Sequence, residues 1–294
     1  MKEKLQVHRV AAALGAEVRG LKLGDIDAET AREIETLLWQ HQVLLFPDQH
    51  LDKEEHIALG EHFGELEGHP HLENAKEDER VFTLKASRGG VADEWHSDLS
   101  FLPRPALVSI LQMEKCPEVG GDTLWANLYQ AFEELSPPLQ ELCEGLSALH
   151  NAEPHDRPEA MHIHPVVRVH PETGRKVLFV NEHFTRRIVE LSVPESELLL
   201  GYLRRWIAKP RFTVRYCWKP GTVAMWDNRC TQHFVLNDFE GERVIQRVTV
   251  MGDDPQGEAP KWEAYSRPGG KSDTSRHDRM LRDHLRSRSE AGEE

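Results

Sequence analysis

Short runs of β-branched and aromatic residues recur along most of the chain and predict β-strands. In the run 212–218, Phe212, Val214 and Trp218 alternate with polar residues, as expected for a strand with one buried face. Similar runs predict further strands, at 43–46, 81–84, 107–113, 166–170, 177–180, 222–226 and 243–251. Thr173-Gly174 separates two of these runs, as a hairpin turn would.

Amphipathic segments between these runs predict helices. In 28–42, Ile34 and Leu38 lie on one helical face, and Asp27 precedes the segment as a candidate N-cap. Comparable patterns predict helices at 51–63, 128–135, 139–146 and 194–207. Many short strands with helices inserted between them favour a mainly β fold, an antiparallel sandwich with flanking helices, over a βαβ array.

The chain is expected to form one domain over 1–265, because no repeat or linker divides it. From residue 266 onward Gly, Ser, Asp and Arg predominate, with few apolar residues beyond Met280, Leu281 and Leu285. Residues 266–294 are therefore predicted to be a polar C-terminal tail, either mobile or a loosely attached helix.

Composition excludes several functional classes. The chain has 294 residues and a net charge of −14, which argues against nucleic acid as a partner because phosphates need neutralising. No apolar run reaches the ~18 residues of a membrane span. The amino-terminal residues lack a secretory signal, which predicts a cytoplasmic protein. The four cysteines are widely spaced, as expected of reduced thiols rather than a disulfide framework or a zinc site. The oligomeric state is left open, a homo-oligomer included.

His96 and Asp98 form the first candidate for metal chemistry. Side chains two residues apart in an extended segment point to the same side, so both can bind one ion. Two histidines and one carboxylate are the ligands of non-haem Fe(II) oxygenases. With 17 histidines in the chain, a single His-x-Asp is weak support. Indeed His50 and Asp52 form a second one, where Asp52 is better explained as a helix cap.

Further motifs along the chain support the His96 and Asp98 pair as part of a metal site. WHSD (95–98), GGDTLWAN (120–127), HPVVRVHPETG (164–174), FVNEHF (179–184) and WDNRCTQH (226–233) follow one another in this order. From about residue 5 to 255 the chain resembles the taurine dioxygenase family of Fe(II)- and 2-oxoglutarate-dependent oxygenases, which includes taurine, alkylsulfate and phenoxyacetate dioxygenases. The resemblance implies a double-stranded β-helix (jelly-roll) core, the cofactors Fe(II), 2-oxoglutarate and O₂, and His96, Asp98 and His233 as iron ligands.

Arg243 and Thr123 are the candidates for holding 2-oxoglutarate. Arg243 follows His233 by ten residues, beyond a turn-like segment, so a returning strand would bring it back beside the metal. Its planar guanidinium matches a carboxylate, and the Thr123 hydroxyl can add a hydrogen bond. Taken alone, an arginine in a strand is usually solvated and a threonine is an ordinary strand residue. In the family, the positions matching Thr123 and Arg243 hold 2-oxoglutarate.

Arg247 is the candidate for binding the substrate. It shares strand parity with Arg243, at a distance of about 13 Å along the strand, so it can meet a separate anion. The resemblance implies that Arg247 grips the substrate anion, that His69 contacts the substrate and that Phe184 forms a pocket wall. Without the family resemblance, Phe184 would be interpreted as a core residue and His69 as a loop residue. Arg247 has a structural alternative, a salt bridge to an acidic residue elsewhere, such as Asp93 or Glu94.

The pocket departs from taurine-using members. Leu72 and Ala92 replace polar residues of that subgroup, and only fourteen residues separate Leu149 from His164, where the family has a longer lid segment. We therefore predict hydroxylation of a small anionic sulfonate, sulfate ester or carboxylate, with release of succinate and CO₂. Two alternatives stay open, desaturation by the same iron chemistry and a non-catalytic 2-oxoglutarate-binding module. A halogenase is disfavoured because Asp98 is present.

Overall fold

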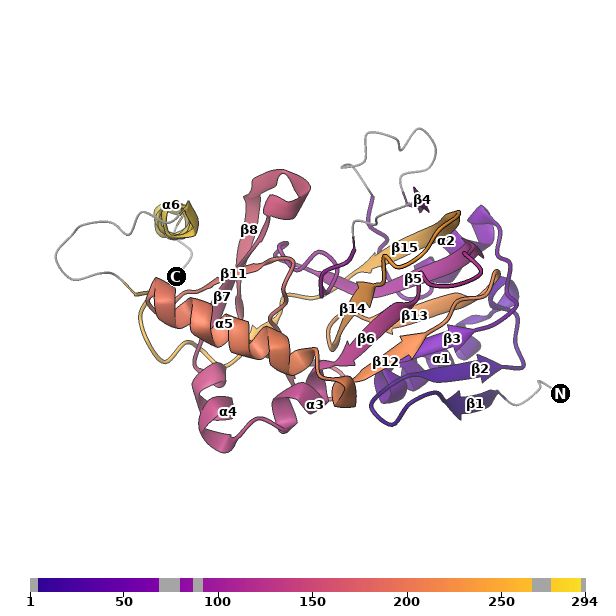
Figure 1. The fold of residues 1–294 in the computed structure, drawn as a ribbon, viewed down its shortest axis with the longest axis horizontal. Helices are drawn as coiled ribbons and strands as arrows, with labels where there is room; N and C mark the ends of the chain where they lie inside the picture. The colour runs from indigo at the N-terminus through magenta and orange to yellow at the C-terminus, as the bar shows by residue number, and fades with distance from the viewer. Residues whose placement is uncertain (1–4, 69–79, 87–91, 266–275, 292–294) are drawn as a thin grey trace.

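The computed structural model describes residues 5–68, 80–86, 92–265 and 276–291 (Figure 1). His69 and Leu72 lie outside these ranges. The larger sheet, here called the main sheet, has seven strands in the order β1-β2-β3-β13-β5-β15-β4. These strands are β1 (Gln6–Arg9), β2 (Ala16–Arg19), β3 (Val43–Phe46), β13 (Val223–Asp227), β5 (Ala106–Lys115), β15 (Arg243–Met251) and β4 (Phe82–Ala86). Neighbours are antiparallel except β2 and β3, which are parallel.

A small sheet of three antiparallel strands faces the main sheet. Its order is β12-β6-β14, with β12 at Thr213–Tyr216, β6 at Thr123–Asn127 and β14 at Thr231–Val235. The buried indole rings of Trp125, Trp218 and Trp226 pack with aliphatic residues of both sheets in one hydrophobic cluster. The two opposed sheets give the mainly β, jelly-roll core that was predicted.

Helices α1 (Ala28–His41) and α2 (Lys53–Glu61) cover the other face of the main sheet. Ile34 and Leu38 of α1 and Leu59 of α2 pack in a cluster with buried residues of β5, β13 and β15. Because both faces of these central strands are covered, their residues are buried almost without interruption. Asp52 caps α2 as predicted, since its carboxylate accepts a hydrogen bond from the Glu55 backbone N–H at 2.8 Å.

The remaining elements form a second layer beside the core (Figure 1). The helices are α3 (Leu128–Glu133), α4 (Pro137–Glu144) and α5 (Val193–Ile207), and the short helices are η2 (Glu153–His155) and η3 (Pro210–Phe212). The short helix η1 (Leu23–Asp25) lies instead against α2, with Leu23 buried in the cluster on the main sheet. One three-stranded sheet contains β11 (Thr185–Ile188), β7 (Ser147–Ala152) and β8 (Arg157–Pro165), and another β10 (Lys176–Leu178), β9 (Val167–Val169) and β16 (Gln256–Gly257).

The C-terminal tail contains α6 (Arg276–Ala291). Leu281 of this helix is buried in a cluster with Leu149 and Val189. Of the two alternatives for the tail, the part that the structure describes corresponds to an attached helix. The division of the chain at residue 265 stays a prediction.

Several boundaries differ from the predicted ones for local reasons. The predicted strand 212–218 begins later because Pro210–Phe212 forms a short 3₁₀ turn, a place where proline's fixed φ is favourable. Strand β14 was not predicted, because Thr231, Gln232 and His233 give it no apolar pattern although all three are buried. Within the described part of the chain, every helix is too short or too polar to span a bilayer.

Candidate metal centre

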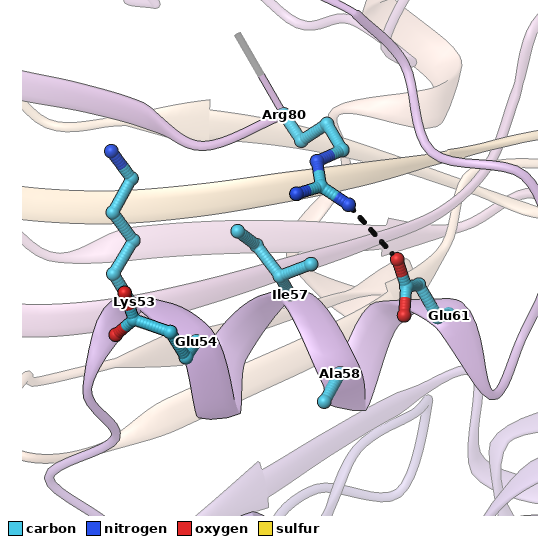
Figure 2. A pocket seen from close by; sticks show the side chains of 6 residues that line it. All are labelled: Lys53, Glu54, Ile57, Ala58, Glu61 and Arg80. Atoms are coloured by element: carbon cyan, nitrogen blue, oxygen red, sulfur yellow. Dashed lines mark hydrogen bonds and ion pairs between the residues drawn. The ribbon is translucent and has the colours of Figure 1, made fainter. Parts of the chain in front are cut away.

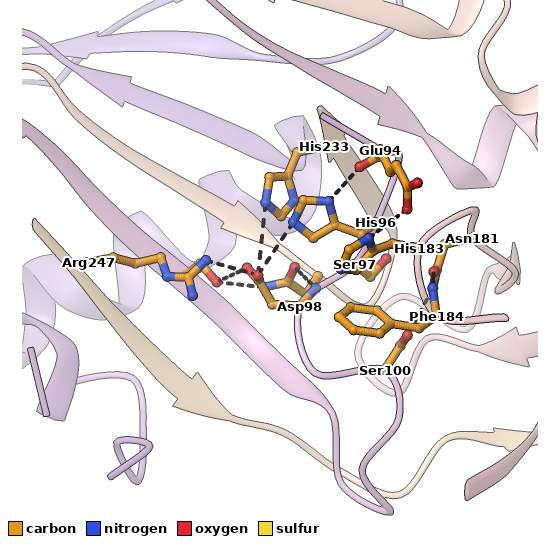
Figure 3. Close-up of polar contacts among 12 residues, drawn as sticks. Glu94, His96, Ser97, Asp98, Ser100, Asn181, His183, Phe184, His233 and Arg247 are labelled. Atoms are coloured by element: carbon orange, nitrogen blue, oxygen red, sulfur yellow. Dashed lines mark hydrogen bonds and ion pairs between the residues drawn. The ribbon is translucent and has the colours of Figure 1, made fainter. Parts of the chain in front are cut away.

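The structure brings His96, Asp98 and His233 together. His96 and His233 pair as an isolated antiparallel bridge, with backbone N–H to O distances of 3.1 and 2.8 Å, and their ring centroids are 4.0 Å apart. Nε2 of each histidine lies 3.9 Å from Asp98 Oδ1, and all three residues are buried. This separation is too long for a hydrogen bond, whereas an ion about 2 Å from each ligand fits between the three atoms (Figure 3).

Burial, neighbouring charge and, for His96, a hydrogen bond give the three residues the protonation states that a metal requires. His96 Nδ1 donates to the Glu94 carbonyl oxygen at 2.7 Å, which leaves the Nε2 lone pair toward the site. Burial lowers the pKa of His96 and His233, so both rings are neutral at pH 7. Burial alone would raise the pKa of Asp98, but the charge of the adjacent Arg247 guanidinium outweighs it and holds that pKa below its usual range.

Arg247 points into the same centre. Its Nη1 donates to Asp98 Oδ1 at 2.9 Å, so its acidic partner is Asp98, not Asp93 or Glu94. Glu94 instead accepts a hydrogen bond from His183 Nδ1 at 2.7 Å. Sequence reasoning missed Glu67, a buried residue that interacts electrostatically with Arg247 and whose pKa is raised to about 7 by burial. No motif marks Glu67, since only its position beside β15 brings it to the site.

Arg243 and Thr123 are both buried near the Gly120-Gly121 turn. Arg243 Nε donates to the Gly121 carbonyl oxygen at 3.2 Å, while among the described residues its Nη2 has no hydrogen-bond partner. Burial lowers the pKa of Arg243 to about 10. Gly121 has φ of +70°, and a Cβ there would lie 3.4 Å from Arg243 Cδ, so glycine suits both the turn and the packing. The Thr123 hydroxyl accepts from Trp218 Nε1 at 2.9 Å.

Phe184 lies beside the candidate metal ligands. Its ring centroid is 6.3 Å from that of His96, and the residue is 2% exposed. His183 and His155, which sequence reasoning did not single out, lie next to it, with ring centroids 4.5 and 5.3 Å from that of Phe184. His183 was visible only as part of the FVNEHF motif, and His155 lies in the short segment between Leu149 and His164.

A second group with metal-binding residue types is a hydrogen-bonded network instead. His170, Asp227 and Cys230 lie together, but His170 Nε2 is already 3.0 Å from Asp227 Oδ2. Arg229 Nη2 donates to the same oxygen at 2.7 Å. The Asp227 carbonyl oxygen also accepts from the Thr231 hydroxyl at 2.8 Å, at the start of β14. Asp227 thus supports the segment that carries His233.

A surface hollow on α2 is separate from this centre (Figure 2). It is lined mainly by long polar side chains, and Arg80 donates to Glu61 across it at 3.0 Å. It contains none of the predicted site residues.

Two histidines and one carboxylate are the ligand set of non-haem iron oxygenases, and here such a set lies buried in a jelly-roll. Residues 5–249 match the family described as taurine catabolism dioxygenase TauD, TfdA family, and the chain belongs to this family. The predicted family and fold are confirmed.

The relatives extend over most of the chain. An alkylsulfatase of Acinetobacter baylyi is 36% identical, with 85% of this chain and 86% of the relative covered. An alpha-ketoglutarate-dependent sulfate ester dioxygenase of Pseudomonas putida is 36% identical, with 86% of this chain and 92% of the relative covered. The crystal structure of a taurine dioxygenase from Burkholderia xenovorans is similar with a TM-score of 0.79 and 35% identity, over 90% and 97% of the two chains. The structure of AAD-2 in complex with Mn(II) and N-oxalylglycine gives a TM-score of 0.76 at 28% identity, over 86% and 99%.

Proposed function

We propose that this protein is an Fe(II)- and 2-oxoglutarate-dependent dioxygenase that hydroxylates a small anionic organic substrate. The reaction consumes O₂ and 2-oxoglutarate and releases the hydroxylated product, succinate and CO₂. The observation that carries the proposal is the buried convergence of His96, Asp98 and His233, together with a buried Arg243 on the same strand as Arg247, which contacts Asp98. Relatives named for sulfate esters, sulfonates and phenoxypropionate support the substrate class.

His96 Nε2, Asp98 Oδ1 and His233 Nε2 would hold the iron. Two neutral imidazoles and one carboxylate on one side of the ion leave the other coordination positions for ligands that react. When bound, Fe(II) supplies the oxidising chemistry of the reaction. The protein contributes the orientation of the reactants and the exclusion of bulk water, since all three ligands are at most 7% exposed.

Arg243 would hold the distal carboxylate of 2-oxoglutarate. A buried guanidinium with an unsatisfied N–H is costly, and among the described residues Arg243 Nη2 has no partner. A carboxylate would satisfy it with charge-assisted hydrogen bonds. Thr123 would add its hydroxyl proton, which is free to donate because the oxygen accepts from Trp218 Nε1.

Arg247 would bind the anionic group of the substrate, with Phe184 as an apolar wall. Nη1 of Arg247 is 2.9 Å from Asp98 Oδ1, so the guanidinium lies next to the reacting centre. Its Nε is buried without a hydrogen-bond partner among the described residues, so the group retains donors for an anion. We retain His69 as a second substrate contact on the basis of the family resemblance.

A substrate panel tests this proposal. Purified protein is loaded anaerobically with Fe(II), and succinate is measured after addition of O₂ and 2-oxoglutarate. The panel contains an alkyl sulfonate, an alkyl sulfate ester and a carboxylate of matched chain length, together with the neutral alcohol. We expect stoichiometric succinate and hydroxylated product, or the aldehyde it collapses to, with at least one anion. Absence of succinate formation above the His233→Ala background with every member, in protein that binds iron, would refute the enzymatic proposal.

A further inference from the structure

Two buried polar side chains lie behind Asp98. Ser109 of β5 and Asn228, directly after β13, are 0% and 1% exposed. Ser109 Oγ lies 2.7 Å from Asp98 Oδ2, and Asn228 Nδ2 lies 2.9 Å from Ser109 Oγ. The three side chains form one hydrogen-bonded chain that ends on the candidate metal ligand.

The direction of every hydrogen bond in this chain is determined. The backbone N–H of Asp98 and the indole N–H of Trp226 both point at one atom of the Asn228 amide, at 3.0 and 3.2 Å. Because both groups can only donate, that atom is the amide oxygen, and the NH₂ group faces Ser109. Ser109 therefore accepts from Asn228, and its single proton is directed to Asp98 Oδ2.

We propose that Ser109, oriented by Asn228, is a positioning residue that makes Asp98 a metal ligand through one oxygen only. Oδ2 is engaged by the hydroxyl proton, whereas Oδ1 faces the Nε2 atoms of His96 and His233, each at 3.9 Å. This inference rests on the metal site of the proposed function. Neither Ser109 nor its strand carries a motif that marks it as part of the site.

The proposal predicts the size of the effect. Groups that orient a metal ligand typically contribute 10- to 100-fold to metal affinity. Without the Ser109 hydroxyl, Asp98 Oδ2 loses its hydrogen-bond donor among the described residues, and only the bond from Arg247 to Oδ1 then restrains the carboxylate. We expect Ser109→Ala to weaken Mn(II) binding at least 10-fold, and Ser109→Thr, which keeps the hydroxyl, to restore much of that affinity.

Thr249 provides a matched control. It lies directly opposite Ser109 on the neighbouring strand β15 and is also 0% exposed. Among the described residues its hydroxyl has no hydrogen-bond partner. Thr249→Val therefore removes a hydroxyl at the same depth without breaking the chain to Asp98, and it reports on packing alone.

The experiment is a titration of the full-length protein with Mn(II), in which free Mn(II) is followed by electron paramagnetic resonance. Circular dichroism and thermal unfolding verify that each variant folds. We expect wild type and Thr249→Val to bind equally and Ser109→Ala to bind at least 10-fold more weakly. Equal binding by Ser109→Ala, or an equal loss in Thr249→Val, would overturn the positioning role.

Two further variants keep the test decisive. Asn228→Asp retains the side-chain shape but replaces the donor to Ser109 by an acceptor, which draws the hydroxyl proton away from Asp98. It should weaken Mn(II) binding even if Ser109→Ala fails to fold, and unchanged affinity in this variant would also count against the inference. Asp98→Ala tests the proposed function separately: if it binds Mn(II) as wild type does, the metal site itself is wrongly assigned.

Discussion

Replacing Arg243 by methionine is expected to stabilise the ligand-free protein while abolishing its response to 2-oxoglutarate. Arg243 is 4% exposed, and its charged group interacts with few partners. Methionine has a similar length and a flexible, apolar side chain, so it can occupy much of the same space. The substitution therefore removes a buried charge with little loss of packing.

The magnitude follows from the pKa. Burial lowers the pKa of Arg243 from 12.5 to about 10. Because one pH unit corresponds to about 1.4 kcal/mol, keeping the guanidinium charged inside the fold costs about 3 kcal/mol. This cost is fully present at pH 7, where the side chain is protonated in both the folded and the unfolded state. The variant also loses the hydrogen bond to the Gly121 carbonyl oxygen, which destabilises it by about 1 kcal/mol. We therefore expect a net gain of about 2 kcal/mol in the free energy of unfolding.

Urea denaturation with and without ligands measures both effects. In wild type saturated with Mn(II), 2-oxoglutarate at 100 times its own dissociation constant should add about 2.7 kcal/mol to the free energy of unfolding, beyond the effect of Mn(II). In Arg243→Met, 2-oxoglutarate should add nothing beyond the effect of Mn(II). Arg32→Met, on the exposed surface of α1, controls for the substitution itself. A less stable Arg243→Met, or one that 2-oxoglutarate stabilises as strongly as wild type, would refute this reasoning.

Three further predictions concern other parts of the molecule. His96→Ala, Asp98→Ala and His233→Ala should each abolish Mn(II) binding in the same titration while thermal unfolding stays cooperative; near-normal binding in any of them would remove that residue from the ligand set. Arg247→Ala should lower turnover of an anionic substrate far more than that of its neutral analogue, and an equal loss for both would make Arg247 structural. Burial lowers the pKa of His56 to about 4, so the unfolded chain takes up a proton that the folded one does not between pH 6.5 and 4. The free energy of unfolding should therefore fall as the pH falls through this window, and His56→Gln should reduce the slope by about one proton, which urea denaturation at several pH values would detect.

Local pattern was sufficient for those parts of the site that depend on one segment. Extended geometry places His96 and Asp98 on one side, and strand parity relates Arg243 to Arg247, because side chains alternate with a period of two. The Asp52 cap likewise depends only on the first turn of its own helix. The family motifs then added His233 and Thr123 as candidates for the same site.

How these segments meet depends on the packing of all the elements and not on local sequence. His233 faces His96 only because β14 pairs with β6 and with the segment that carries His96. The pairing of β13 with β5 also brings Asn228 to Ser109 behind Asp98, and the docking of α6 buries Leu281. Such contacts join residues that are distant in the chain and carry no periodic signal.

The fold class, the family and the residue types of the candidate site could therefore all be predicted from the amino-acid sequence. The sequence does not show which buried polar atoms have hydrogen-bond partners, or which groups those partners are. Arg247 was expected to meet the substrate anion or, alternatively, an acidic residue such as Asp93 or Glu94, yet its guanidinium lies 2.9 Å from Asp98 Oδ1. The physical reason is that hydrophobic periodicity specifies which face of an element is buried, whereas hydrogen-bond partners and pKa values depend on the few ångströms that separate buried groups after all elements have packed.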